Sequence, residues 1–181
     1  MIAAVIALAA CQSNKGVKPR VTVAVDSADQ VYAAMKTTMV RKGIRTSDIV
    51  ADSAWGYQAR QVFDLHHMTV KMFDSTGAMI STITADKGIY KIRDESLDAR
   101  GNVVATSTGG KVLKTEHLIF DNRRNLITSD TAFTSTSPQG NVSGAHFEAD
   151  PGFKNVVINR MKAVQKGKGI AMPGARGGGN K

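Results

Sequence analysis

Four short segments decide the fold of this chain: ADKGIY (85–90), LDARGNVV (97–104), LKTEHLIFD (113–121) and NLITSD (125–130). Each contains aliphatic or β-branched residues next to turn formers such as Gly, Asn and Asp. Short strands separated by turns at intervals of about 8 to 12 residues are typical of an all-β sheet that curls or stacks. The segments contain no recognisable catalytic motif, so we expect the function to lie in a surface or a groove of the sheet.

The strand pattern continues on both sides of these segments, and it predicts a β domain over residues 48–163. Residues 61–73 and 78–85 are separated by the turn sequence DSTG (74–77), which favours a β-hairpin. Strand runs bounded by turn residues indicate about nine to eleven strands in total. Gly101 and Asn102 tolerate positive φ angles, so we expect the chain to turn or bend across a corner there.

Alternation of apolar residues changes phase within residues 61–73. The alternating apolar residues of this segment are Phe63, Leu65, Met68, Val70 and Met72. The phase changes at His66 and His67, which predicts a β-bulge or a sheet that is buried on both faces. The pattern does not decide whether the odd-numbered or the even-numbered residues face inward.

Residues 28–42 carry a helical pattern. Ser27 and Gln30 have the spacing of a capping box, and Gly43 is suited to end a helix. The apolar residues at helical spacing are Val31, Met35 and Met39. We therefore predict that residues 12–47 form a tether followed by a short amphipathic helix. Packing of this helix against its own β domain is the simpler arrangement, and docking onto a membrane or partner is the alternative.

The N-terminal segment contains an apolar run over residues 2–10 that ends in LAAC (8–11). This run is much shorter than the roughly 20 residues of a membrane-spanning helix, but it suits the apolar region of a secretory signal. Its end resembles the bacterial lipobox, in which the cysteine thiol accepts a diacylglyceryl group. We predict a lipoprotein-type signal over residues 1–11 with Cys11 as the lipid-attachment site. A coincidental run of small residues is the alternative, and no basic residue precedes the run.

The net charge of +9 is concentrated at the C-terminal end. Residues 154–181 contain seven Lys or Arg and no acid, which leaves 17 basic and 15 acidic residues in the rest of the chain. The predicted β domain is thus nearly neutral, and nucleic acid is not an expected partner. We predict that residues 164–181 form a disordered basic tail, which could touch anionic lipid head groups.

No catalytic or cofactor motif is present in the sequence. A nucleophile elbow, a P-loop and a dinucleotide fingerprint are all missing. The histidines are His66, His67, His117 and His146. Adjacent residues of a regular strand point to opposite faces, so His66 and His67 share a metal ion only if the strand bulges. We expect no enzyme, no cofactor and no metal, and a hydrolase or metal site at His66 and His67 is the remaining alternative.

The four opening segments, in their order and spacing, resemble the LptC family of lipopolysaccharide-export proteins and the related LptA proteins. With ADSAW (51–55) and the predicted hairpin, the resemblance covers roughly residues 28–160. It implies a twisted, open β-jellyroll whose interior is a slot for the acyl chains of lipid A. Members of the family join edge to edge into a bridge across the periplasm, and they catalyse no covalent step.

On this resemblance we predict a component of the lipopolysaccharide transport bridge that passes lipid A to the next jellyroll protein. The implied partners are lipopolysaccharide, an inner-membrane ABC transporter, and a soluble LptA-type protein that pairs through a β-sheet edge. The residues predicted to line the slot are Phe63, Leu65, Met68, Val70, Met72, Ile80 and Ile83. Ordinary core filling is the competing interpretation of these side chains.

The predicted anchor differs from that of familiar family members, which carry an N-terminal transmembrane helix. Acyl chains on Cys11 would replace that helix, because two or three chains anchor a protein stably. We therefore predict a lipid-anchored protein on the periplasmic side of the cell envelope, with the inner membrane favoured over the outer. The alternative function is an envelope scaffold lipoprotein that binds protein partners through its sheet edges without carrying lipid.

Overall fold

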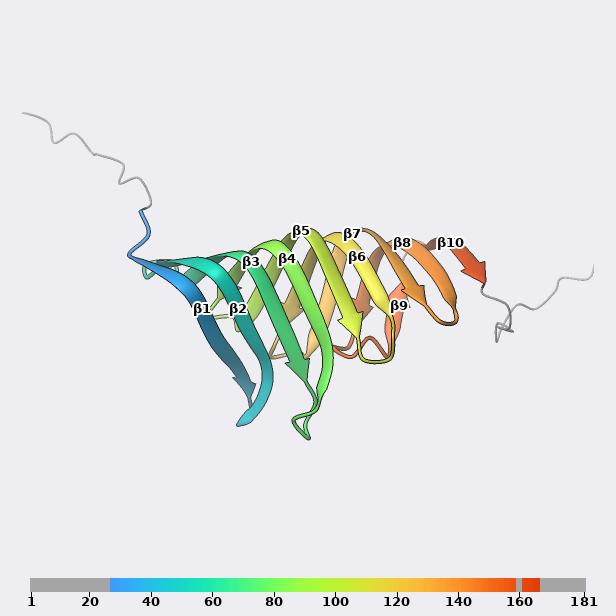
Figure 1. The fold of residues 1–181 in the computed structure, drawn as a ribbon, viewed down its shortest axis with the longest axis horizontal. Coiled ribbons are helices and arrows are strands. Elements are labelled where there is room, and N and C mark those ends of the chain that lie inside the picture. Colours follow the sequence, from blue (N-terminus) through green and yellow to red (C-terminus); the bar gives the residue numbers. More distant parts are fainter. Residues whose placement is uncertain (1–26, 159–160, 167–181) are drawn as a thin grey trace, which may run out of the picture.

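A single antiparallel sheet makes up the computed structural model, which describes residues 27–158 and 161–166 (Figure 1). Strands β1 to β8 pair in chain order, β10 follows β8, and the short β9 pairs with β8 beside this path. The strands are β1 (Gln30–Arg41), β2 (Ile44–Tyr57), β3 (Val62–Phe73), β4 (Met79–Lys91), β5 (Ser96–Ser107), β6 (Val112–Asp121), β7 (Leu126–Ser137), β8 (Gly140–Ala149), β9 (Val156–Ile158) and β10 (Met161–Lys166). The prediction of an all-β, open sheet is confirmed.

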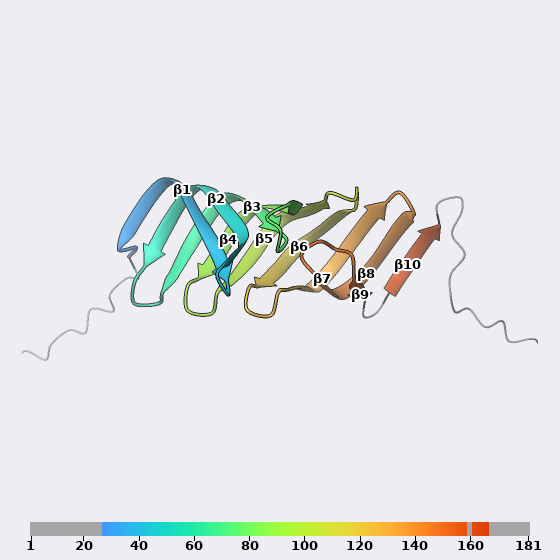
Figure 2. The same ribbon diagram turned by 90° about the horizontal axis from the view of Figure 1, so that it is seen from below.

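The sheet extends along an axis that crosses its strands, with β1 at one end and β10 at the other (Figure 2). Tight turns connect the strands. In the β3–β4 turn, the Asp74 carboxylate accepts backbone N–H groups of Thr76 and Ala78, and Gly77 has a φ of 86°. Gly adopts this left-handed conformation without steric cost. The hairpin predicted at residues 61–85 is thus present as β3 and β4.

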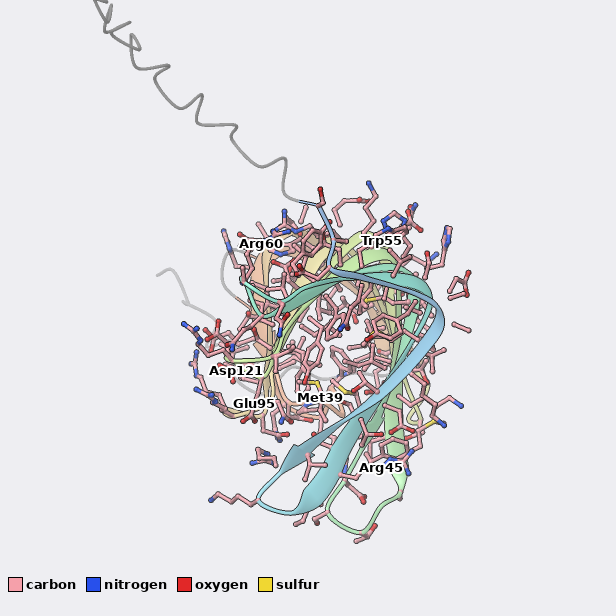
Figure 3. All side chains as sticks on the ribbon, turned by 90° about the vertical axis from the view of Figure 1, so that its left-hand side faces the viewer. Met39, Arg45, Trp55, Arg60, Glu95 and Asp121 are labelled. Atoms are coloured by element: carbon pink, nitrogen blue, oxygen red, sulfur yellow. The ribbon has the colours of Figure 1, made fainter. Side chains whose placement is uncertain are left out.

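A line of backbone bends crosses the sheet near the middle of each strand from β1 to β8. We call it the seam, and it consists of residues that are left out of the pairing ladder between neighbouring strands. They are Ala34, Asp52, His67, Asp86, Gly101, Asn102, Glu116, Asp130, Thr131 and His146. Half of them have positive φ angles. An extra unpaired residue bends a strand and increases its twist, so the seam folds the sheet around an interior filled with side chains (Figure 3).

The seam explains the phase change that the sequence shows at His66 and His67. His67 has a φ of 47°. Leu65 is buried on one side of it, and Met68 and Val70 are buried on the other, although they have the opposite parity. Both parities therefore face the interior, each on its own side of the bend. The corner predicted at Gly101 and Asn102 is another part of the same seam.

The helix predicted over residues 28–42 is wrong, because this segment forms β1 and pairs with β2. Ala34 lies in the seam and has a φ of 57°. Side chains alternate between the two faces of the strand on each side of this bend, and Tyr32 and Met39 both point inward. Their spacing of seven residues is also that of two helical turns. Pairing with β2 and the β-branched residues of the segment favour the strand. The sheet consequently begins at Gln30, ahead of residue 48.

Two predicted segments lie largely or wholly outside the described residues. The lipoprotein-type signal with Cys11 belongs to residues 1–26, and most of the predicted basic tail belongs to residues 167–181. The first residues of that tail, 164–166, are part of β10. Within the described part of the chain, no helix has the length and apolar character needed to cross a membrane.

Candidate functional site

The residues predicted to line a slot all lie on β3 and β4 and face the interior. Five of them are almost fully buried, with exposures of 0–1%: Leu65, Met68, Val70, Met72 and Ile83. Phe63 and Ile80 are partly buried and pack against the same core. The structure thus brings the seven side chains together on one surface. Their contact with lipid stays a prediction.

Two apolar rows extend this surface across the sheet, one on each side of the seam. Cross-strand pairing sets their order. The first row is Ile49, Val70, Ile83, Ala105 and Leu113. The second row is Phe63, Tyr90, Leu97, Phe120, Ile127, Ala149 and Val156. The rows run perpendicular to the strands, so the apolar lining follows the long axis of the molecule from β2 to β9.

Side chains pack closely within this interior. A Cβ atom at Gly88 would overlap Sδ of Met68, so a larger residue there must displace the Met68 side chain. Burial raises the pKa of the Tyr90 phenol, with a smaller contribution from the nearby charge of Glu95. Both observations describe a closely filled, apolar interior. Methionine suits such a position because its unbranched side chain adapts to varied shapes.

The apolar interior is exposed at the β1 end of the sheet. Tyr32 faces inward from β1 and contacts Phe63 edge to face, with 6.0 Å between ring centroids, yet 41% of its surface is exposed. A pocket of about 290 Å³ adjoins this end and is lined by Gly56, Tyr57, Phe63 and Ile92, among others. Near the other end, Phe133 and Phe147 meet edge to face at 5.0 Å. An apolar ligand could thus reach the interior from β1.

A buried polar contact closes the side of the interior that lies opposite the seam. Asn122, in the β6–β7 turn, has no exposed surface. Its Oδ1 accepts a hydrogen bond of 2.6 Å from the Thr46 hydroxyl, and its Nδ2 donates to the Val40 carbonyl at 3.2 Å. Nδ2 also donates to Glu95 in the β4–β5 turn. The β1–β2 hairpin is thereby fastened to the β6–β7 turn, which lies about 80 residues later in the chain.

An outward-facing charged cluster lies on β5, β6 and β7. Asp98 is 6% exposed and accepts two hydrogen bonds from the Arg100 guanidinium, of 2.8 and 3.0 Å. His117 lies between two carboxylates, with Nε2 3.0 Å from Asp98 and Nδ1 2.8 Å from Asp130. Burial alone would raise the pKa of Asp98, but hydrogen bonds and charges from Arg100 and His117 outweigh burial and lower it. The cluster holds three neighbouring strands together by charge pairing.

The lowered pKa of Asp98 predicts a loss of stability in acid. A carboxyl with a lower pKa in the folded state stabilises the protein fully above its unfolded pKa, near 3.8, and loses this contribution as the pH falls through the folded value. We expect the unfolding free energy to drop below about pH 4. Asp98→Asn should cost about 1–3 kcal/mol at pH 7 and should flatten this drop. Urea unfolding of both proteins at pH 7, 4 and 3 measures both effects. An equal fall of the unfolding free energy with decreasing pH in the two proteins would contradict the assignment.

The adjacent histidines predicted as an alternative site have separate surroundings. The His66 ring packs against Trp55 with 4.6 Å between ring centroids. His67 is largely exposed and lies 3.6 Å from Asp52. Among the described residues, no group of three or more His, Cys, Asp or Glu side chains is arranged to hold a metal ion. The observed contacts of both histidines are those of surface residues.

Sequence reasoning missed Asn122 and the second apolar row. Asn122 lies in the sequence DNRRN (121–125), which indicates a turn and gives no sign of burial. The second row was detectable in part, because Phe120 and Ile127 belong to the apolar runs LIF (118–120) and LI (126–127). Their alignment with Phe63 depends on pairing across five strands, β3 to β7, which local patterns do not report.

Comparison with known proteins assigns the chain to a family. Residues 1–166 match the family model described as "Lipopolysaccharide-assembly, LptC-related". The chain belongs to this LptC-related family. Members serve in lipopolysaccharide transport and assembly at the cell envelope, as transport components that are not enzymes. No curated protein matched the chain in a sequence search.

Proposed function

We propose that this LptC-related chain carries lipopolysaccharide by holding the acyl chains of lipid A in its interior. The observation that carries the proposal is the pair of apolar rows that run along the long axis of the sheet. A ligand with several parallel hydrocarbon chains matches such an elongated apolar lining. Each methylene group that moves from water into the interior contributes about 0.8 kcal/mol.

The open edges of the sheet support a role as one link of a bridge. Within the described residues, β1 pairs only with β2, and β10 pairs only with β8. Unpaired edges expose backbone groups that another strand can extend, and this is a common mode of protein recognition. The apolar rows run across the sheet from β2 to β9, so a partner sheet added at either edge would extend the molecule along the axis of this lining. The proposed neighbours are the inner-membrane ABC transporter on one side and an LptA-type bridge protein on the other.

The proposed anchor is Cys11, acylated after signal cleavage. The sequence LAAC (8–11) supports it, because the thiol follows an apolar run of suitable length. A Cys11→Ala variant should leave the membrane fraction and appear in the soluble periplasmic fraction. Retention of this variant in the membrane would refute acylation as the anchor.

Site-specific photo-crosslinking tests the proposed lipid cargo. Benzoylphenylalanine at Phe63 would place a reactive ketone on the interior surface, and the same residue at Trp55 on β2 would face outward beside buried Gly56. We expect lipopolysaccharide adducts at Phe63, and less than about a tenth of that yield at Trp55. Immunoblots with antibodies to the protein and to lipopolysaccharide quantify the adducts. Equal yields at both positions would refute an interior site.

The same experiment separates the alternative function. A scaffold that binds protein partners through its edges would give adducts with proteins and none with lipid at Phe63. Circular dichroism of both variants controls for folding, because Phe63 lies against Gly56 and leaves little room for a larger ring.

A further inference from the structure

The bend at the seam brings two rims of the sheet opposite each other. The first rim contains the β1–β2 and β3–β4 turns, and the second contains the β6–β7 turn and the loop over residues 150–155. Ser81 donates a hydrogen bond to the Pro151 carbonyl, and Lys111 donates to the Phe153 carbonyl. Nearer to β1, Asn122 bonds to Thr46 and Val40. These contacts close the interior along its length.

Within the β1–β2 hairpin, β1 has few buried side chains, whereas β2 contributes Ile49, Ala51 and Ala54 to the core. Met39 is the one side chain of β1 that is fully buried. β1 is also an edge strand, so only β2 shares its backbone hydrogen bonds. Figure 3 shows β1 crossing beside the position of Glu95, which shares Asn122 as a hydrogen-bond partner with Val40. Segments with few buried apolar contacts open most readily, so β1 and the exposed β1–β2 turn are the parts of this hairpin best able to move away from the second rim.

A cavity of about 310 Å³ lies between the rims beside this contact, and Thr46 is among its lining residues. Its apolar lining includes Ile44, Phe73 and Ile80, and its basic lining consists of Arg41, Lys42 and Arg45. Arg45 pairs with Asp48, whereas the buried Nε of Arg41 has no hydrogen-bond partner among the described residues. A cavity lined by both apolar and basic side chains suits an amphiphile that carries acyl chains and an anionic head group.

Two carboxylates also line this cavity, but their own turns occupy them. Asp74 accepts hydrogen bonds from Thr76 and Ala78, and Asp150 accepts from the backbone N–H groups of Gly152 and Asn155. A hydrogen bond from the Thr76 hydroxyl is the main cause of the lowered pKa of Asp74. These acids therefore stabilise the two rims, and Arg41 and Lys42 remain to meet an anion.

We propose that acyl chains enter the interior sideways, through the gap between the β1–β2 hairpin and the β6–β7 turn, and that Asn122 holds this gap shut. The proposal rests on the proposed function, since it concerns how the same interior is loaded. Asn122 thus keeps the gap closed by hydrogen bonds to both of its sides, and the cavity beside it is the outer opening of the gap.

A reversible bridge across the gap tests this route. The full-length Cys11→Ser protein would carry Thr46→Cys, Asn122→Cys and benzoylphenylalanine at Phe63. A short bis-methanethiosulfonate reagent would join the two new thiols, and dithiothreitol would release them. With purified lipopolysaccharide as the probe, we expect bridging to lower the yield of lipid adducts at least tenfold and reduction to restore it. Equal yields with and without the bridge would overturn the proposal and would place loading at the exposed β1 end.

A matched pair controls for chemical modification. Thr82 and Thr106 face each other on β4 and β5 outside the gap. The same bridge between cysteines at these positions should leave adduct formation unchanged, and an equal loss there would overturn the assignment of the gap.

A second variant opens the gap instead of closing it. Asn122→Ala in the Cys11→Ser background should raise the initial rate of adduct formation several-fold. An unchanged rate would overturn the proposal that Asn122 holds the gap shut. If the protein with only Cys11→Ser and the probe at Phe63 forms no lipid adduct, the proposed function itself fails. A normal yield that the bridge does not alter refutes the sideways route alone.

Discussion

Val70→Asp is expected to lower the unfolding free energy by about 4 kcal/mol or more. Val70 has no exposed surface, and its cross-strand neighbours Ile49 and Ile83 are equally buried. A carboxylate placed there would lose its hydration without gaining a partner. Urea denaturation should show the loss, together with a fall in melting temperature of about 8–16 °C.

Leu65→Asp provides a second test of the same geometry. Leu65 and Val70 have opposite parity, so in a regular strand one of them would tolerate a charge. The bend at His67 turns both inward, and we expect similarly large losses from both. The control is Lys71→Asp, which introduces the same side chain at an exposed neighbour on β3. A tolerant Leu65 or an intolerant Lys71 would contradict the observed seam.

Much of the fold follows from local signals in the sequence. The turn DSTG (74–77) connects β3 to β4 as expected, and Gly101 and Asn102 mark a corner because few other residues adopt positive φ readily. The phase change at His66 and His67 also reports a real bend. These features depend on neighbouring residues alone, and a local pattern therefore contains enough information to predict them.

The errors arise where distant pairing decides the outcome. Met35 and Met39 repeat at a spacing that fits a helix, and nothing local shows that Ala34 bends a strand there. Pairing with β2 satisfies the backbone of this segment and overrides the helical pattern. The sequence of β3 alone likewise does not show whether its odd- or even-numbered residues face the interior. The seam that turns both inward becomes visible only when neighbouring strands are aligned.

The filled interior and the proposed cargo place opposite demands on the same side chains. Met68 and Met72 are fully buried in the closed sheet, yet under the proposed function they would have to make room for acyl chains. Unbranched, flexible methionine side chains rearrange at low cost. Separation of the rims would supply the remaining space. The same residues can therefore serve as core when the sheet is empty and as lining when it is loaded.

Asn122→Ala is the second large effect that we expect, because Asn122 is a fully buried polar residue with partners on the β1–β2 hairpin and at Glu95 in the β4–β5 turn. Its removal leaves the Val40 carbonyl without this donor, and the Thr46 hydroxyl keeps only its bond to the Met39 carbonyl. The loss should be about 2–4 kcal/mol, measured by urea unfolding.

Combination with Thr46→Ala identifies the origin of the Asn122→Ala loss. If the contact between the rims is responsible, the double variant should lose less than the sum of the single variants, by about 0.5–3 kcal/mol. Arg124→Ala is the matched control, since this exposed residue lies in the same β6–β7 turn and, within the described part of the chain, no hydrogen bond of its side chain crosses the gap. Additive losses, or an equal loss from Arg124→Ala, would show that the turn itself was damaged. Coupling between residues 76 positions apart would instead demonstrate that Asn122 joins the β1–β2 hairpin to the opposite rim.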